Sequence, residues 1–255
     1  MPTQAAARYA DDMTASLIVE TERWDLAAKY FDVPDSESGV GIAAVPAAGE
    51  HAAHGASVPK GVVGGVASAP SWAVAVRNFV LGLAGAQTGS SDPERSVARL
   101  REFRGKLGWN VDRYRAAQVE VMEDEVTAMA RAANGKFDQA IELMKKATAR
   151  EEELSPPSGP PDLIKPSHEL FGEILLRAGR PAEAAQQFRT ALLRQPNRAR
   201  ALLGAARAAA RAGDRAAAEM AYAALLDVWK NADTQLAELR EARDFLRQAR
   251  AQATQ

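Results

Sequence analysis

The chain has 255 residues, a formal net charge of −1 and no cysteine. A nucleic-acid-binding domain is usually basic, so this charge balance gives no reason to expect a nucleic-acid partner. The lack of cysteine excludes disulfide bonds and thiolate chemistry within the chain.

The N-terminal segment 1–34 has the pattern of a helix pair. Residues 13–22 have helical composition, and Trp24-Asp25-Leu26-Ala27-Ala28-Lys29-Tyr30-Phe31 follows as a second helix. The first residues lack the basic segment and apolar core of a signal peptide. We therefore expect the chain as written to stay in the cytoplasm, and to lie in the periplasm if it is a fragment of an exported parent.

Segment 35–70 is rich in Gly, Ala, Val, Pro and Ser and shows no helical period. This composition predicts a long loop or a disordered insertion. The alternative is a loop that folds back over the helices and is anchored by Val62, Val63 and Val66. His51 and His54 lie three residues apart beside Glu50, which allows a second hypothesis of a metal- or small-ligand-binding accessory protein. In a Gly/Ala-rich loop without cysteine, solvent exposure of both histidines is the expectation we favour.

Segment 71–110 predicts a further helix pair. The expected helices cover Trp72 to Ala86 and Glu94 to Lys106, with a turn between Thr88 and Pro93. The first helix is the longest apolar stretch of the chain, but it is too short to span a bilayer and contains Arg77 and Asn78. We expect a buried helix here and no membrane insertion.

Segment 111–154 predicts a helix, a turn at Gly135 and a second helix with Ala140, Met144 and Ala147 at its packing positions. Segment 155–165 contains four prolines, which predicts an extended connector. The next helix follows Pro166, and we expect Ser167 to cap it.

Segment 166–232 contains two similar helical hairpins. Their turn glycines, Gly179 and Gly213, are 213 − 179 = 34 residues apart. The first hairpin carries Gly172, Ala184, Phe188, Ala191 and Pro196, and the second carries Ala206, Ala218, Tyr222, Leu225 and Lys230 at the same spacing. A small residue lets the backbones of crossing helices approach, and an aromatic ring fills the space beside the crossing. Segment 233–255 predicts a charged capping helix and a tail.

A 34-residue helical hairpin with these positions resembles the tetratricopeptide repeat family, including its uncharacterised bacterial members. The resemblance implies an all-α fold, an α-solenoid of antiparallel helix-turn-helix repeats closed by the C-terminal helix. It also implies a non-catalytic scaffold that binds another protein or a peptide segment in its concave groove. No catalytic motif is present, so we expect neither enzyme activity nor a cofactor.

In this family the first helix of each repeat lines the groove. The matching positions of this chain are Met122, Glu125, Met129, Glu169, Glu173, Leu176, Arg177, Arg200, Leu203, Arg207 and Arg211. Arg207 and Arg211 are four residues apart and share a helix face. With Arg200 they predict a basic strip that binds carboxylates, the alternative being an ordinary solvated face. Acidic residues at one end and arginines at the other suit an amphoteric peptide, and exposed repeat ends also allow self-association.

Overall fold

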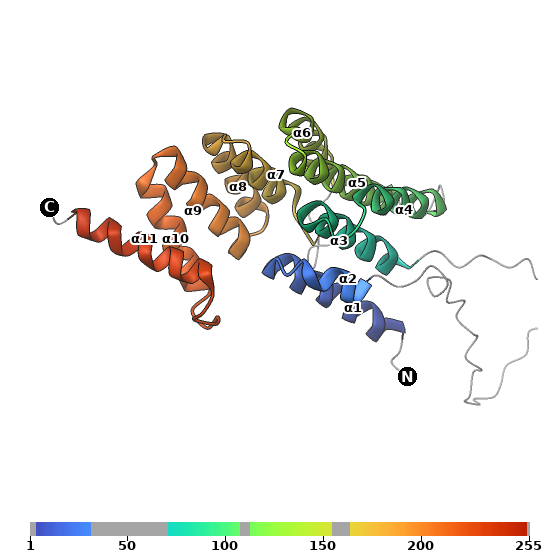
Figure 1. The fold of residues 1–255 in the computed structure, drawn as a ribbon, viewed down its shortest axis with the longest axis horizontal. Coiled ribbons are helices and arrows are strands. Elements are labelled where there is room, and N and C mark those ends of the chain that lie inside the picture. The colour runs from blue at the N-terminus through green and yellow to red at the C-terminus, as the bar shows by residue number, and fades with distance from the viewer. Residues whose placement is uncertain (1–3, 32–70, 108–112, 155–163, 254–255) are drawn as a thin grey trace, which may run out of the picture.

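The computed structural model describes residues 4–31, 71–107, 113–154 and 164–253, and all regular structure in these ranges is helical. Figure 1 shows the helices following one another along an elongated molecule. Their bounds are α1 Gln4–Thr21, α2 Asp25–Phe31, α3 Trp72–Thr88, α4 Pro93–Lys106, α5 Arg113–Ala133, α6 Phe137–Glu153, α7 Ser167–Arg177, α8 Pro181–Arg194, α9 Ala199–Ala212, α10 Arg215–Val228 and α11 Ala237–Ala253. The all-α prediction is confirmed for these ranges. The predicted insertion 35–70 and most of the connector 155–165 lie outside them.

From α3 onward the helices form two layers. Each of α3, α5 and α7 packs against the next odd-numbered helix as well as against its sequence neighbours, whereas α4, α6, α8 and α10 pack mainly against odd-numbered helices. We call α3, α5, α7 and α9 the inner helices and the four even-numbered ones the outer helices. Burial follows the same division, since α5 is buried along most of its length while α8 buries only Ala184, Phe188 and Ala191.

Three inner-to-outer turns have the same hydrogen bonds. After α7, the amide of Arg180 donates to the carbonyl of Leu175 at 2.9 Å, and Gly179 donates to Leu176 at 3.3 Å. The turns after α5 and α9 repeat both bonds. In all three the glycine has a positive φ, 71° at Gly135, 73° at Gly179 and 82° at Gly213. This left-handed conformation suits glycine because a Cβ atom would be strained there.

The aromatic ring of Phe188 packs directly on two glycines. A Cβ atom added to Gly172 in α7 would lie 2.7 Å from the ring, and one added to Gly204 in α9 would overlap it. Phe188 is fully buried, so α8 fits between two inner helices at a single point of close approach. The sequence predicted the contact between Gly172 and Phe188, but it did not single out Gly204.

The helix α1 leads into the interior of the molecule. Ala15, Ile18 and Val19 are fully buried, and both α1 and α2 pack against α3. Figure 1 shows α1 running beneath α3, with its carboxyl-terminal end on the side of α7 and α9. The two ends of the described chain therefore differ in their packing. The first helix, α1, packs mainly against α3, which is not its sequence neighbour, whereas α11 packs mainly against its sequence neighbour α10.

None of the helices in the described ranges combines the length and apolar character that a bilayer span requires. The apolar α3 is instead a packed helix, with Phe79, Val80 and Leu83 buried.

Candidate functional site

The predicted groove residues fall into two groups. Six of them have little or no contact with solvent: Met122, Glu125, Met129, Glu169, Arg200 and Leu203. Glu173, Leu176 and Arg207 are partly exposed, and Arg177 and Arg211 are exposed. The buried six lie on helix faces that neighbouring helices cover, so only the second group is accessible to a partner in this conformation.

Arg177, Arg207 and Arg211, which we call the arginine edge, lie toward the carboxyl-terminal ends of α7 and α9. Arg177 donates to the side-chain oxygen of Gln87 in α3 at 2.6 Å. Arg211 donates to the carbonyl of Leu176 at 3.4 Å. The geometry brings the predicted Arg207 and Arg211 together with Arg177. The bond from Arg211 is long, and its guanidinium has further N–H donors for another acceptor.

A hollow of about 380 Å³ opens beside the arginine edge. It is lined by Arg207, Ala210, Arg211, Tyr222 and Glu241. Arg207 forms a bidentate ion pair with the Glu241 carboxylate of α11, and the shortest of its hydrogen bonds is 2.6 Å. The Tyr222 hydroxyl donates a hydrogen bond to the same carboxylate at 2.6 Å. The hydrogen bonds from Arg207 lower the pKa of Glu241. Arg207 therefore holds α11 against α9, which is a structural task that the sequence did not indicate.

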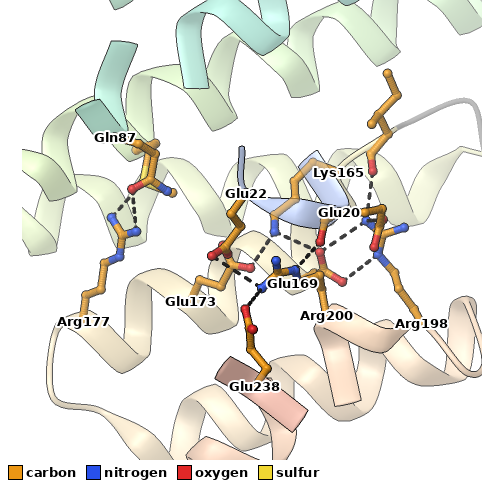
Figure 2. A network of polar contacts seen from close by, with 12 residues as sticks. Glu20, Glu22, Gln87, Lys165, Glu169, Glu173, Arg177, Arg198, Arg200 and Glu238 are labelled. Carbon is orange, nitrogen blue, oxygen red and sulfur yellow. Dashed lines mark hydrogen bonds and ion pairs between the residues drawn. The ribbon is translucent and has the colours of Figure 1, made fainter. Parts of the chain in front are cut away.

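A second charged group lies at the opposite ends of the inner helices. Figure 2 shows this charge cluster, which we define as Glu20, Glu22, Lys165, Glu169, Glu173, Arg198, Arg200 and Glu238. At its centre the Lys165 ammonium contacts Glu169 at 2.9 Å and Glu173 at 2.5 Å. Lys165 and Glu169 are almost completely buried.

Lys165 and Glu169 are each stabilised in the charged form by their partners. Burial opposes ionisation of Glu169, but Lys165 and Arg198 outweigh it and lower the pKa of the carboxyl. Burial would likewise lower the pKa of Lys165, but Glu169 and Glu173 raise it instead. Removing a single partner from such a buried pair is costly, because the remaining charge is left in a poorly hydrated place.

The end of α1 completes the cluster. The Arg198 guanidinium contacts the Glu20 carboxylate at 2.5 Å and Glu169 at 2.6 Å. Arg200 donates to the backbone carbonyl of Glu20 at 2.5 Å and lies 3.5 Å from Glu22. Residues 180 positions apart in the sequence thus meet on the inner helices.

Glu238 extends the cluster to the last helix of the chain. Its carboxylate lies 3.4 Å from Arg200, so that this guanidinium contacts both α1 and α11. Figure 2 shows Arg200 between Glu22 on one side and Glu238 on the other.

Glu125 is the least satisfied polar side chain near the cluster. Both of its carboxylate oxygens are fully buried and lack a hydrogen-bond partner, as does the hydroxyl oxygen of Ser167. Burial, together with the neighbouring Glu151, raises the pKa of Glu125 well above its ordinary value. Its predicted role as a groove residue is not available in this conformation, because the carboxyl group has no contact with solvent.

Ser167 does not cap α7 as the sequence predicted. It is the first helical residue, and its amide donates to the Glu151 carboxylate of α6 at 2.7 Å. Pro166 occupies the capping position without a side-chain bond. The expected local cap is therefore replaced by a carboxylate from the preceding hairpin.

Sequence reasoning missed much of the charge cluster. Lys165 was assigned to the connector, and Glu20, Glu22, Arg198 and Glu238 were assigned no role. One signal was present, because Glu20 and Glu22 lie at the carboxyl end of a helix, where the helix dipole disfavours negative charge. Such an ending suggests a cationic partner from elsewhere in the chain.

The described residues contain no group of three or more His, Asp or Glu side chains arranged to hold a metal ion. His51 and His54, on which the metal hypothesis rests, lie outside the described ranges. That hypothesis therefore stays a prediction.

Comparison of the chain with protein-family models, with curated proteins and with solved structures gave no match. The resemblance to tetratricopeptide repeats consequently rests on the residues and the geometry of this chain.

Proposed function

We propose that the chain is a non-catalytic interaction module, an α-solenoid of tetratricopeptide-like hairpins that binds a protein segment along its inner helices. The partner is another protein or a peptide with carboxylates that can reach the arginine edge.

The repeated geometry supports the proposed architecture. The hairpins α7–α8 and α9–α10 turn through the same pair of backbone bonds at Gly179 and Gly213, and the turn after α5 has them as well. Phe188 occupies the helix crossing that the resemblance assigns to it. A stack of similar hairpins places its first helices in one continuous layer, which is how such arrays present a binding surface.

The proposed binding role depends chiefly on one observation, the docking of the end of α1 on the inner helices. Arg198, at the N-cap of α9, and Arg200, in its first turn, contact the side-chain carboxylate and the backbone carbonyl of Glu20, respectively. The same layer therefore has the chemistry to hold a helical segment through arginine-to-oxygen contacts. The arginine edge lies on the same layer of helices, and there the side chain of Arg211 is exposed.

The proposal is tested by affinity capture from a lysate of the source cell, with captured proteins identified by mass spectrometry. The wild-type chain is compared with a double variant, Arg177→Glu and Arg211→Glu. Charge reversal at two exposed groove positions should remove a carboxylate-bearing partner, because like charges repel. Arg207 is left unchanged, since its reversal would place two carboxylates together at Glu241.

The matched control is Arg189→Glu, a charge reversal at an exposed position of the outer helix α8. We expect a protein that wild type and control retain and the double variant loses, with equal helicity in all three. Identical sets of captured proteins would contradict the assignment of the arginine edge as the binding surface.

A further inference from the structure

The contacts of the α1 end have the form of a receptor and a ligand within one chain. Arg200 is buried, with 5% of its side chain exposed, and it reaches the last-turn carbonyl of Glu20. The carbonyls of the last helical turn have no partner inside the helix and carry partial negative charge. Arg198 adds a contact with the Glu20 carboxylate. Together the two arginines recognise a helix carboxyl terminus that also carries acidic side chains.

The sequence of α1 is locally unfavourable for this ending. No basic residue lies in its last turn, and Glu22 directly follows the helix with a φ of 54°. That left-handed position is usually filled by glycine or asparagine. The two glutamates therefore weaken the isolated helix end and gain their compensation from α9. A conflict between local and tertiary preference is expected where a segment serves a second purpose.

The arginines are not left without anions when α1 departs. Arg198 keeps its contact with Glu169 at 2.6 Å, and Arg200 keeps Glu238 at 3.4 Å. An emptied receptor would thus retain partners for both buried guanidinium groups. This limits the electrostatic cost of losing α1, whereas the buried side chains of Ile18 and Val19 also have to leave their apolar contacts.

We propose that the end of α1 is an exchangeable occupant of the Arg198–Arg200 receptor, and that a partner helix ending in paired glutamates competes with α1 for this place. The inference rests on the proposed binding role of the inner helices and specifies both the chemistry of the partner and its regulation. In the resting chain α1 covers the receptor, and a partner gains access by displacing it.

The test uses the full chain and a fluorescein-labelled peptide with the sequence of residues 4–31 as the probe. In wild type the tethered α1 is present at an effective concentration of about millimolar order, so the peptide should bind weakly. The double variant Glu20→Gln and Glu22→Gln removes the anchoring carboxylates of α1. We expect it to bind the peptide at least about tenfold more tightly than wild type, measured by fluorescence anisotropy.

Two controls fix the site of binding. A peptide of residues 4–31 that carries glutamine in place of both glutamates should bind the double variant no more tightly than it binds wild type. Adding Arg198→Gln and Arg200→Gln to the double variant should abolish the tighter binding of the unaltered peptide. Equal binding of the peptide by wild type and the double variant, or equal binding of the neutral peptide, would overturn the proposal.

Hydrogen exchange of the unaltered wild-type chain gives a second test that needs no variant to fold. We expect the amides of α1 to exchange at least about tenfold faster than those of α9, through local opening. Raising the NaCl concentration from about 0.02 M to about 0.5 M should speed exchange in α1 further, because salt screens the ion pairs. Equal and salt-independent protection of α1 and α9 would overturn the proposal.

The result can be separated from that of the capture experiment, which alters the arginine edge and leaves the receptor unchanged. Peptide binding without a captured partner would support the receptor and count against the wider binding role. Capture without peptide binding would leave the binding role intact and exclude α1 as the competitor.

Discussion

At the scale of single residues, the molecule places charged groups where hydration is poor and compensates most of them. Lys165 and Glu169 are buried as a pair, and Arg198 supplies the second cation. Glu125 differs, because neither of its oxygens has a hydrogen-bond partner. It is therefore the residue at which we expect protonation to affect stability most clearly.

Replacing Glu125 with glutamine should raise the free energy of unfolding at pH 7 by about 1 kcal/mol or more. The folded state raises the pKa of this carboxyl, so it holds the proton above the pH at which the unfolded chain releases it. The contribution of this carboxyl to stability thus falls as the pH rises above about 4.3, the pKa of an unperturbed glutamate. Urea unfolding of both proteins from about pH 4 to pH 7 measures this.

The gain from Glu125→Gln should become small near pH 4, where the wild-type carboxyl is mostly protonated in both states. A gain that is constant over the whole pH range would show that titration of Glu125 is not its cause. Glu153→Gln, at an exposed position of α6, provides the control and should change stability little at any pH.

A methyl group at Gly172 should destabilise the fold by about 1–2 kcal/mol, measured by urea unfolding. The added Cβ would lie 2.7 Å from the buried ring of Phe188. This overpacking exceeds the gain in helix propensity from Gly to Ala, about 1 kcal/mol. Gly105→Ala is the matched control, because a Cβ atom there meets nothing within 4 Å and should give a small gain. Equal effects at both sites would disprove the close crossing.

At the scale of helices, ends are satisfied by neighbouring helices as well as by local caps. The start of α7 uses the Glu151 carboxylate of α6, and the end of α1 uses Arg200 of α9. In contrast, α10 has its own cap, since Asp214 accepts from the amide of Ala217 at 3.0 Å. The first two helices therefore depend on their neighbours for their termini.

Replacing Glu151 with alanine should lower the free energy of unfolding by about 1–3 kcal/mol. The change leaves the buried amide of Ser167 without an acceptor and removes the carboxylate beside Arg194. Glu153→Ala, two residues along the same helix and exposed, should stay within about 0.5 kcal/mol of wild type. Urea unfolding of the two variants side by side decides this, and equal losses would contradict the capping role.

The helices themselves were largely predictable, whereas their long-range contacts were not. Glycines at helical turns and small residues at crossings are local signals, and Gly179, Gly213 and Phe188 behave as predicted. Which helix face stays accessible depends on what covers it. The resemblance placed Met122 and Leu203 on a groove, but neighbouring helices bury them. The repeat length contains no information on where α1 docks, so the partners of Arg198 could not be derived from it.

At the scale of the whole molecule, the charge cluster joins the beginning, the middle and the end of the described chain. Arg200 of α9 contacts Glu20 of α1 and Glu238 of α11, so three separate elements meet at one side chain. The inner helices thus carry two charged regions, one occupied by α1 and one exposed at the arginine edge. The proposed binding role and its regulation both follow from this division.

The docking of α1 on α9 is the claim on which the account depends most, and the coupling energy between Glu20 and Arg198 tests it most directly. A double-mutant cycle with Glu20→Gln and Arg198→Gln, followed by urea unfolding, isolates this pair from the other contacts of Arg198. Their contact of 2.5 Å between partly and largely buried side chains predicts a coupling of about 1 kcal/mol. A coupling of zero within error would contradict the docking and, with it, the receptor for acidic helix ends.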